Sequence, residues 1–154
     1  MSIKKFSEHE YSELKEFLSF YSAHYMPIDQ LPPELRPVAC LEMMEKRSPK
    51  MVLQGLRQAI NDIIEMARRA DHKEIEKIDS ELKSQNVVTL SELRRRFSAD
   101  YARIIKRAKI NNEVEYYLVI NIINDNPESL NKEERDIISK IILEFEEKIA
   151  KSTK

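Results

Sequence analysis

The chain has 154 residues, of which 42% are hydrophobic and 34% are charged, and its formal net charge is -1. This length suits one domain with a buried core, and the near-neutral charge excludes a whole-protein attraction to nucleic acid or anionic membrane. One cysteine excludes an intramolecular disulfide, and no hydrophobic leader opens the chain, so we expect a cytoplasmic protein without membrane contact.

Glycine is the most restrictive feature of the composition, because the chain contains only Gly55. Phosphate-binding loops, dinucleotide-binding fingerprints and tight hairpin turns each need several glycines. We therefore expect an all-α fold, in which residues 1–154 form a single-domain bundle of seven or eight helices.

The first expected helix begins at a capping box formed by Ser7 and Glu10, and its apolar stripe runs to Tyr25. Four of the six prolines follow within residues 26–37, which predicts an extended connector. A short helix over residues 38–47 comes next, and the tail 150–154 should fray. Polar capping residues precede each of the later helices, at Ser48, Asp71, Thr89, Ser98, Asn112 and Asn131.

One segment is ambiguous between helix and strand. Residues 116–123, YYLVINII, have a composition that is typical of strands. We favour a helix because Asn112 and Glu115 form a capping pattern and no partner strand is evident. The Asn126-Pro127 pair then ends it.

Recognised catalytic and metal-binding motifs are missing from the sequence. His9, His24 and His72 lack the spacing of metal-binding helices, and the paired glutamates are typical of solvated helix faces. We therefore identify no catalytic, cofactor-binding or metal-binding residue and expect no enzyme. Tyr21 and Tyr25, beside the connector, form a candidate aromatic contact surface, with a place at the edge of the core as the alternative.

Charge is segregated toward the end of the chain. Residues 89–110 carry seven basic and two acidic side chains, whereas residues 111–154 carry six basic and ten acidic ones. The basic stretch can bind nucleic acid, face solvent, or meet the acidic C-terminal helix within the chain or across a dimer. Its candidate interaction residues are Arg94, Arg95, Arg96, Arg103, Lys106, Arg107 and Lys109.

Within this stretch, ELRRRFSADYARI (residues 92–104) resembles a helix-turn-helix, and it is similar to some winged-helix DNA-binding domains. The apolar positions that carry the resemblance are Leu93, Phe97, Ala102 and Ile104. A wing would need a glycine-bearing hairpin, and no glycine follows. The resemblance implies a recognition helix with these residues near the major groove: Asp100, Tyr101, Arg103, Lys106 and Arg107.

Two functional hypotheses follow from these features. The preferred one is a non-enzymatic helical protein-interaction module, such as an adaptor, a regulatory subunit or an immunity or antitoxin-type neutraliser. Its partner would be another protein or a second copy of the chain. The alternative is a nucleic-acid-binding regulator that uses residues 89–110.

Overall fold

The structure is a computed structural model that describes residues 8–152, and within that range it is built from helices without strands. The all-α prediction is therefore confirmed, including a helix across the ambiguous residues 116–123. The eight α-helices of the described range are α1 (Glu8–Tyr25), α2 (Pro37–Arg47), α3 (Pro49–Ala67), α4 (His72–Ser84), α5 (Leu90–Phe97), α6 (Ala99–Arg107), α7 (Glu113–Asp125) and α8 (Lys132–Ser152).

The helix starts coincide with the expected capping residues. Thr89 and Ser98 each accept a hydrogen bond from the backbone N–H three residues later, at 3.1 and 3.2 Å. Asn112 and Asn131 do the same at 2.9 and 2.7 Å, while Asp71 caps α4 through the N–H two residues on. These bonds satisfy N–H groups that a helix leaves unpaired at its start. The capping box expected at Ser7 lies outside the described residues.

Two details differ from the expectation. The connector over residues 26–37 is not extended, because it forms two short 3-10 turns, Ile28–Gln30 and Pro33–Leu35, each held by local backbone hydrogen bonds. Of the tail predicted to fray, residues 150–152 belong to α8, which continues to Ser152, and residues 153–154 lie outside the described residues.

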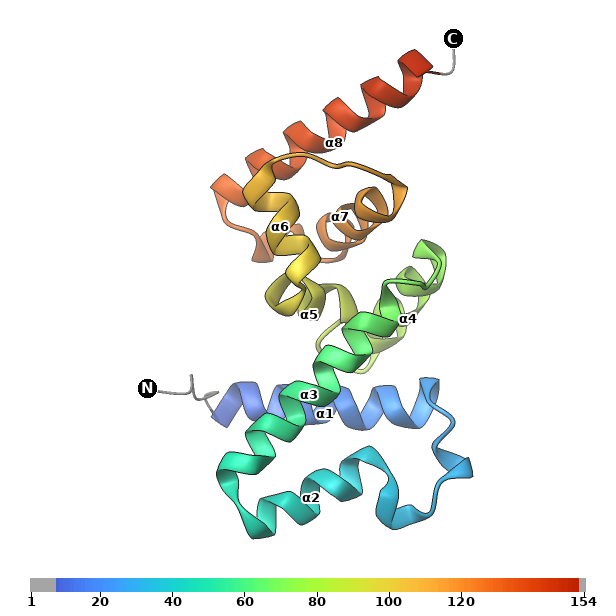
Figure 1. The fold of residues 1–154 in the computed structure, drawn as a ribbon, viewed down its shortest axis with the longest axis vertical. Helices are drawn as coiled ribbons and strands as arrows, with labels where there is room; N and C mark the ends of the chain where they lie inside the picture. Colours follow the sequence, from blue (N-terminus) through green and yellow to red (C-terminus); the bar gives the residue numbers. More distant parts are fainter. Residues whose placement is uncertain (1–7, 153–154) are drawn as a thin grey trace.

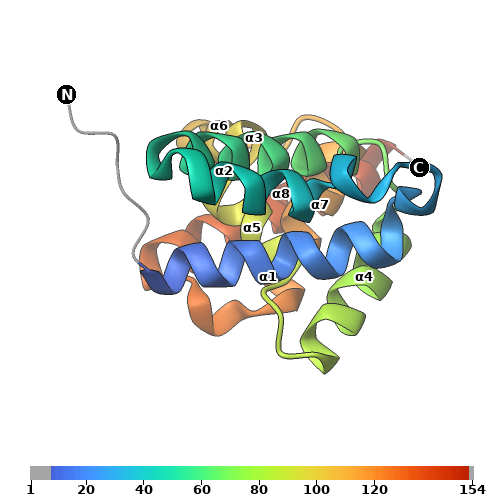
Figure 2. The same ribbon diagram turned by 90° about the horizontal axis from the view of Figure 1, so that it is seen from below.

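The hairpin of α2 and α3 explains the position of the only glycine. A Cβ atom on Gly55 would lie 2.7 Å from the Met44 sulfur, so the absence of a side chain lets the two helices approach closely. Figure 2 shows α1 running alongside this hairpin, and the three helices enclose the N-terminal part of the core.

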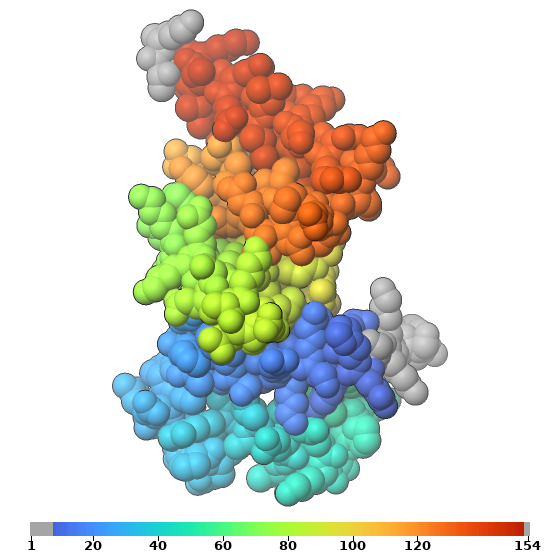
Figure 3. Space-filling model, turned by 180° about the vertical axis from the view of Figure 1, so that it is seen from behind, coloured from blue at the N-terminus to red at the C-terminus, as the bar shows by residue number. Residues whose placement is uncertain are grey.

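Buried apolar residues form two clusters. The helices that carry the first cluster and those that carry the second follow one another along the long axis of the molecule (Figure 1). The first joins α1, α2, α3 and α4 to the inner face of α5, and the second joins α6, α7 and α8. Viewed from behind, α4 lies between the N-terminal helices and α7 (Figure 3). The helices α4, α5 and α7 therefore connect the two clusters.

Buried polar contacts join these three helices. Asp79 of α4 accepts a hydrogen bond from the backbone N–H of Ser91 at 3.0 Å, and Thr89 donates one to Asp125 of α7 at 2.6 Å. All four side chains are largely buried. Buried polar groups are stable only when they are hydrogen-bonded, so these pairs help to fix how the two clusters are joined.

Candidate functional site

The basic run at the end of α5 is used mainly for internal ion pairs. Arg95 makes two parallel hydrogen bonds to Glu92, at 3.0 and 2.7 Å, and lies 3.8 Å from Glu134 of α8. Arg96 bonds to Glu92 and to Glu13 of α1, both at 2.7 Å. Burial alone would raise the pKa of Glu92, but the hydrogen bonds from Arg95 and Arg96 outweigh burial and lower the pKa. Both arginines therefore connect α5 to other helices.

Arg94 is a correction to the expected basic face, because it is buried. Only 5% of its surface is exposed, and it points toward the α4–α7 interface rather than into solvent. The reason is its position in the helix: with Leu90, Leu93 and Phe97 it occupies spacings of three and four, which form one face of a helix.

The basic residues of α6 are closer to the expected surface. Arg103 pairs with Asp100, yet its side chain remains 68% exposed. Arg107 bonds to Glu115 of α7 at 2.5 Å and to the backbone carbonyl of Lys109. Lys106 and Lys109 are exposed, and no carboxylate of the described residues forms an ion pair with either.

The acidic end of α8 does not cover the basic stretch. Glu144 lies near Lys140 of its own helix, and Glu146 accepts a hydrogen bond from the Tyr116 hydroxyl at 2.5 Å. Among the described carboxylates of α8, Glu134 in the first turn is the one that pairs with a basic residue of this stretch, Arg95. Glu134 also accepts a hydrogen bond from the hydroxyl of Tyr101. Charge segregation in the sequence therefore does not correspond to one interface within the chain.

The expected aromatic surface is wrong for Tyr21, which is buried in the first cluster with its ring centroid 5.4 Å from that of Phe17. Tyr25 is half-buried against it, with a centroid distance of 5.1 Å. Burial and the neighbouring carboxylate of Glu81 raise the pKa of Tyr25 to about 12. These two rings belong to the edge of the core.

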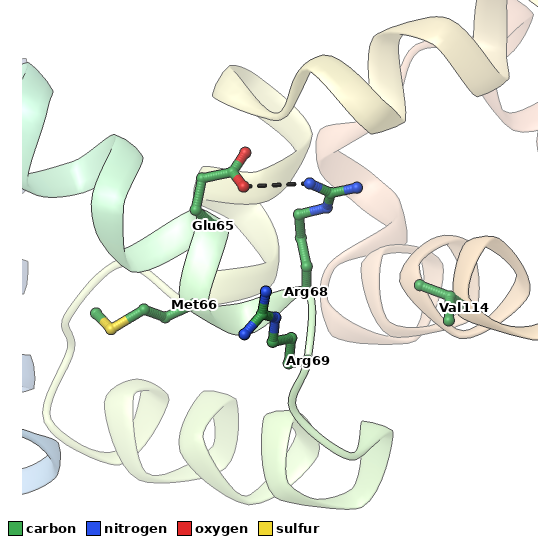
Figure 4. Close-up of a pocket in the computed structure, with 5 residues that line it drawn as sticks. All are labelled: Glu65, Met66, Arg68, Arg69 and Val114. Atoms are coloured by element: carbon green, nitrogen blue, oxygen red, sulfur yellow. Dashed lines mark hydrogen bonds and ion pairs between the residues drawn. The ribbon is translucent and has the colours of Figure 1, made fainter.

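A cleft between the end of α3 and the start of α7 contains exposed side chains. Its outer part has a volume of about 530 Å³ and is lined by residues of both helices (Figure 4). Met66 and Val114 flank it, with 53% and 62% of their surfaces exposed, and Arg68 and Arg69 lie between them. The hollow therefore has one exposed apolar side chain from each helix, with two arginines between them.

The outer hollow lies beside the basic residues of α6. Arg68 bonds to Glu65 at 3.2 Å and also pairs with Asp100 of α6, with its Nε 2.7 Å from the carboxylate. Because Asp100 also binds Arg103, the guanidinium groups of Arg68 and Arg103 share one carboxylate. Around the outer hollow, the three basic side chains of Arg68, Arg69 and Arg103 therefore outnumber the two carboxylates of Glu65 and Asp100.

The inner part of the cleft, which we call the inner cavity, has a volume of about 240 Å³ and shares Arg68 and Val114 with the outer hollow. Arg94 and Asn121 line it, and both are nearly fully buried. The imidazole of His72 stacks on the Tyr117 ring at its wall, with centroids 3.9 Å apart and planes 5° apart. Apolar side chains complete the wall, at Ala67, Ala70, Val114 and Leu118.

Two residues that line the inner cavity each carry a buried polar atom without a partner. The Nε of Arg94 and the Oδ1 of Asn121 are enclosed, and neither forms a hydrogen bond within the described part of the chain. Burial lowers the pKa of Arg94 to about 10, although the charges of Asp79 and Asp100 act in the opposite direction. A desolvated positive charge therefore lies at the wall of the cavity.

Sequence reasoning missed the inner cavity because its residues are far apart in the chain. One local signal was available: Arg94 and Asn121 stand at inward helical positions, the first beside Leu93 and the second between Leu118 and Ile122. A polar residue within an apolar stripe indicates either a buried network or a site.

Comparison with known proteins adds no relative: no family model matches the chain, and neither curated proteins nor solved structures gave a significant match. No helix within residues 8–152 is both long enough and apolar enough to cross a membrane.

Proposed function

We propose that the protein is a non-enzymatic binding module whose partner is another protein, and that the partner binds at the outer hollow between α3 and α7. The observation that carries the proposal is the pairing of Met66 and Val114, two exposed apolar side chains from different helices, on either side of Arg68 and Arg69.

The chemistry of the hollow favours a partner segment that is both acidic and apolar. Arg69 forms no ion pair with a described residue. Arg103 adds a further positive charge near the hollow, because it pairs with Asp100, the carboxylate that also pairs with Arg68. Two apolar contacts separated by a basic centre suit a segment that carries apolar side chains on either side of a carboxylate.

In the described part of the chain, neither the outer hollow nor the inner cavity is lined by a serine, threonine or cysteine that could act as a nucleophile.

A displayed library of random 12-residue peptides tests this proposal with defined probes. We expect enriched peptides to combine Asp or Glu with aliphatic or aromatic residues. Their affinity, measured by fluorescence anisotropy, should fall at least tenfold for the double variant Met66→Lys/Val114→Lys and for Arg69→Glu. The matched control is Leu143→Lys, which replaces an apolar residue of α8 that is 57% exposed and should leave affinity unchanged.

The proposal fails if no peptide is enriched, or if the double variant binds the enriched peptides as well as the wild type does. Sedimentation velocity tests whether the partner is a second copy of the chain, because it measures whether the protein forms a dimer. A dimer that the double variant abolishes, and Leu143→Lys does not, would make a second copy of the chain the protein that binds.

The exposed edge of α6 favours a second candidate, binding to nucleic acid. Arg103, Lys106 and Lys109 face solvent, and three phosphate contacts would give a logarithmic salt slope of about -3 for duplex DNA. Anisotropy with labelled DNA and RNA at 50 and 200 mM salt tests it, with Arg103→Glu/Lys106→Glu as the variant. Absence of binding at 50 mM salt would dismiss this candidate.

A further inference from the structure

The inner cavity contains a charge that the fold leaves without a partner. Arg94 is 5% exposed and Asn121 is 3% exposed, so water reaches neither freely. Asp79, one of the two carboxylates that act on Arg94, is engaged by Ser91, and Asp100, the other, pairs with Arg68 and Arg103. A buried guanidinium with no hydrogen-bonded counterion destabilises the fold, and a bound anion would remove that cost.

The guanidinium of Arg94 favours a carboxylate as the bound anion. A guanidinium presents parallel N–H groups that match the two oxygens of a carboxylate, and such pairs are stronger than neutral hydrogen bonds. Asp71 and Glu113 lie at the wall of the same cavity, and their charges oppose the entry of a phosphate or a dicarboxylate. One negative charge on the ligand therefore suits the cavity better than two.

The walls and the volume define the rest of the ligand. Ala67, Leu118 and the Tyr117 ring offer apolar contacts beside Arg94. At roughly 30 Å³ for each water-sized group, 240 Å³ holds a molecule of about eight non-hydrogen atoms. We propose that the inner cavity binds a small organic monocarboxylate, whose carboxylate pairs with Arg94 and whose short apolar part contacts Ala67 and Leu118.

The Arg94 Nε–H group is the direct reporter of this proposal. In a ¹H–¹⁵N spectrum of arginine side chains, the Arg94 signal is assigned as the one that Arg94→Lys removes. Sodium acetate, propionate, butyrate and benzoate are titrated in a carboxylate-free buffer, with chloride and inorganic phosphate at matched ionic strength as comparisons. We expect at least one carboxylate to shift this signal saturably with a Kd below 10 mM, and chloride and phosphate to leave it in place.

Two variants separate binding from folding. Arg94→Met should abolish the saturable shift of the remaining cavity signals, and Ala70→Leu, which fills the cavity without removing the guanidinium, should weaken binding at least tenfold. Arg69→Gln changes an arginine of the outer hollow and should bind as the wild type does. The peptide experiment does not depend on Arg94, so each proposal can fail alone.

Three results would overturn the proposal. One is an Arg94 signal that no carboxylate moves at 50 mM, which would mean that the cavity holds water. Another is an equal response to chloride and phosphate, which would indicate ionic strength alone. The third is undiminished binding by a folded Ala70→Leu variant, which would place the carboxylate elsewhere.

Discussion

The carboxylate of Asp79 accepts two hydrogen bonds from Ser91, one from the backbone N–H at 3.0 Å and one from the hydroxyl. Ser91 is fully buried and Asp79 nearly so, and the pair joins α4 to the first turn of α5. Burial raises the pKa of Asp79 to about 6. The hydrogen bonds from Ser91 and the positive charge of Lys83 act to lower this pKa, whereas the negative charge of Asp125 raises it further.

The raised pKa makes stability depend on pH in a defined window. Well below pH 3.8 the Asp79 carboxyl is protonated in the folded and unfolded states alike. Between pH 4 and 6 ionisation favours the unfolded chain, so this group's contribution to stability is lost as the pH rises through the folded pKa. A pKa of about 6 against 3.8 corresponds to a loss of about 3 kcal/mol.

Asp79→Asn removes this titration while keeping groups that can bond to Ser91. The unfolding free energy of the wild type minus that of the variant should fall by about 2.4 kcal/mol between pH 4 and 7, because about 0.6 kcal/mol of the total is already lost at pH 4. Urea denaturation at pH 4, 5, 6 and 7 measures it. A difference that stays flat over this pH range would contradict the assignment.

Thr89 has two separable roles at the start of α5. Its hydroxyl oxygen accepts the Glu92 N–H at 3.1 Å, and the hydroxyl donates to the Asp125 carboxylate at 2.6 Å. Thr89→Ala loses a cap worth about 1 kcal/mol and a hydrogen bond to a charged group worth about 1.5 kcal/mol or more. Chemical denaturation should therefore show a loss of about 2–3 kcal/mol. Thr89→Ser keeps both bonds and should lose under about 1 kcal/mol; equal losses in the two variants would exclude the hydroxyl as the cause.

Gly55 allows a steric effect to be separated from helix propensity. Gly55→Ala gains about 1 kcal/mol of propensity, but the new Cβ requires the flexible end of Met44 to move. In a Met44→Ala background no such movement is needed, so the same substitution should stabilise by the full value of about 1 kcal/mol. The measurement is a double-mutant cycle by urea denaturation. A gain of the same size in both backgrounds would show that Met44 does not restrict this position.

The helices and their starts could be predicted because capping and apolar periodicity act over a few residues. Thr89, Ser98 and Asn112 each cap the helix that they precede. Helix ends are less predictable: α6 ends at Arg107, and its C-cap, Ala108, lies in the left-handed region with φ of 55°, where glycine is the usual signal.

The candidate site could not be predicted, because charge counts along the chain do not give tertiary partners. Arg96 reaches Glu13, a residue 83 positions away, and this pairing uses a charge that looked available for nucleic acid. Charge alone groups Arg94 with Arg95 and Arg96, whereas its helical spacing places it on the buried face of α5.

Arg94→Met tests whether the buried guanidinium costs stability when the inner cavity has no ligand. The pKa of Arg94 is lowered from 12.5 to about 10, so the charged form carries an unfavourable free energy of about 3 kcal/mol at all lower pH values. Methionine has a comparable length and removes this cost, although Asp79 loses a nearby positive charge. We therefore expect the unfolding free energy to rise by about 1–2 kcal/mol.

Denaturation of Arg94→Met and of Arg95→Met at pH 7 provides the comparison. Arg95 makes two hydrogen bonds to Glu92, so its replacement should destabilise by about 1 kcal/mol, opposite in sign to the effect at Arg94. If Arg94→Met instead destabilised by more than about 1 kcal/mol, the guanidinium would be satisfied within the fold. The cavity would then have no need of an anion, whereas a gain in stability is the result typical of a residue retained for binding rather than for folding.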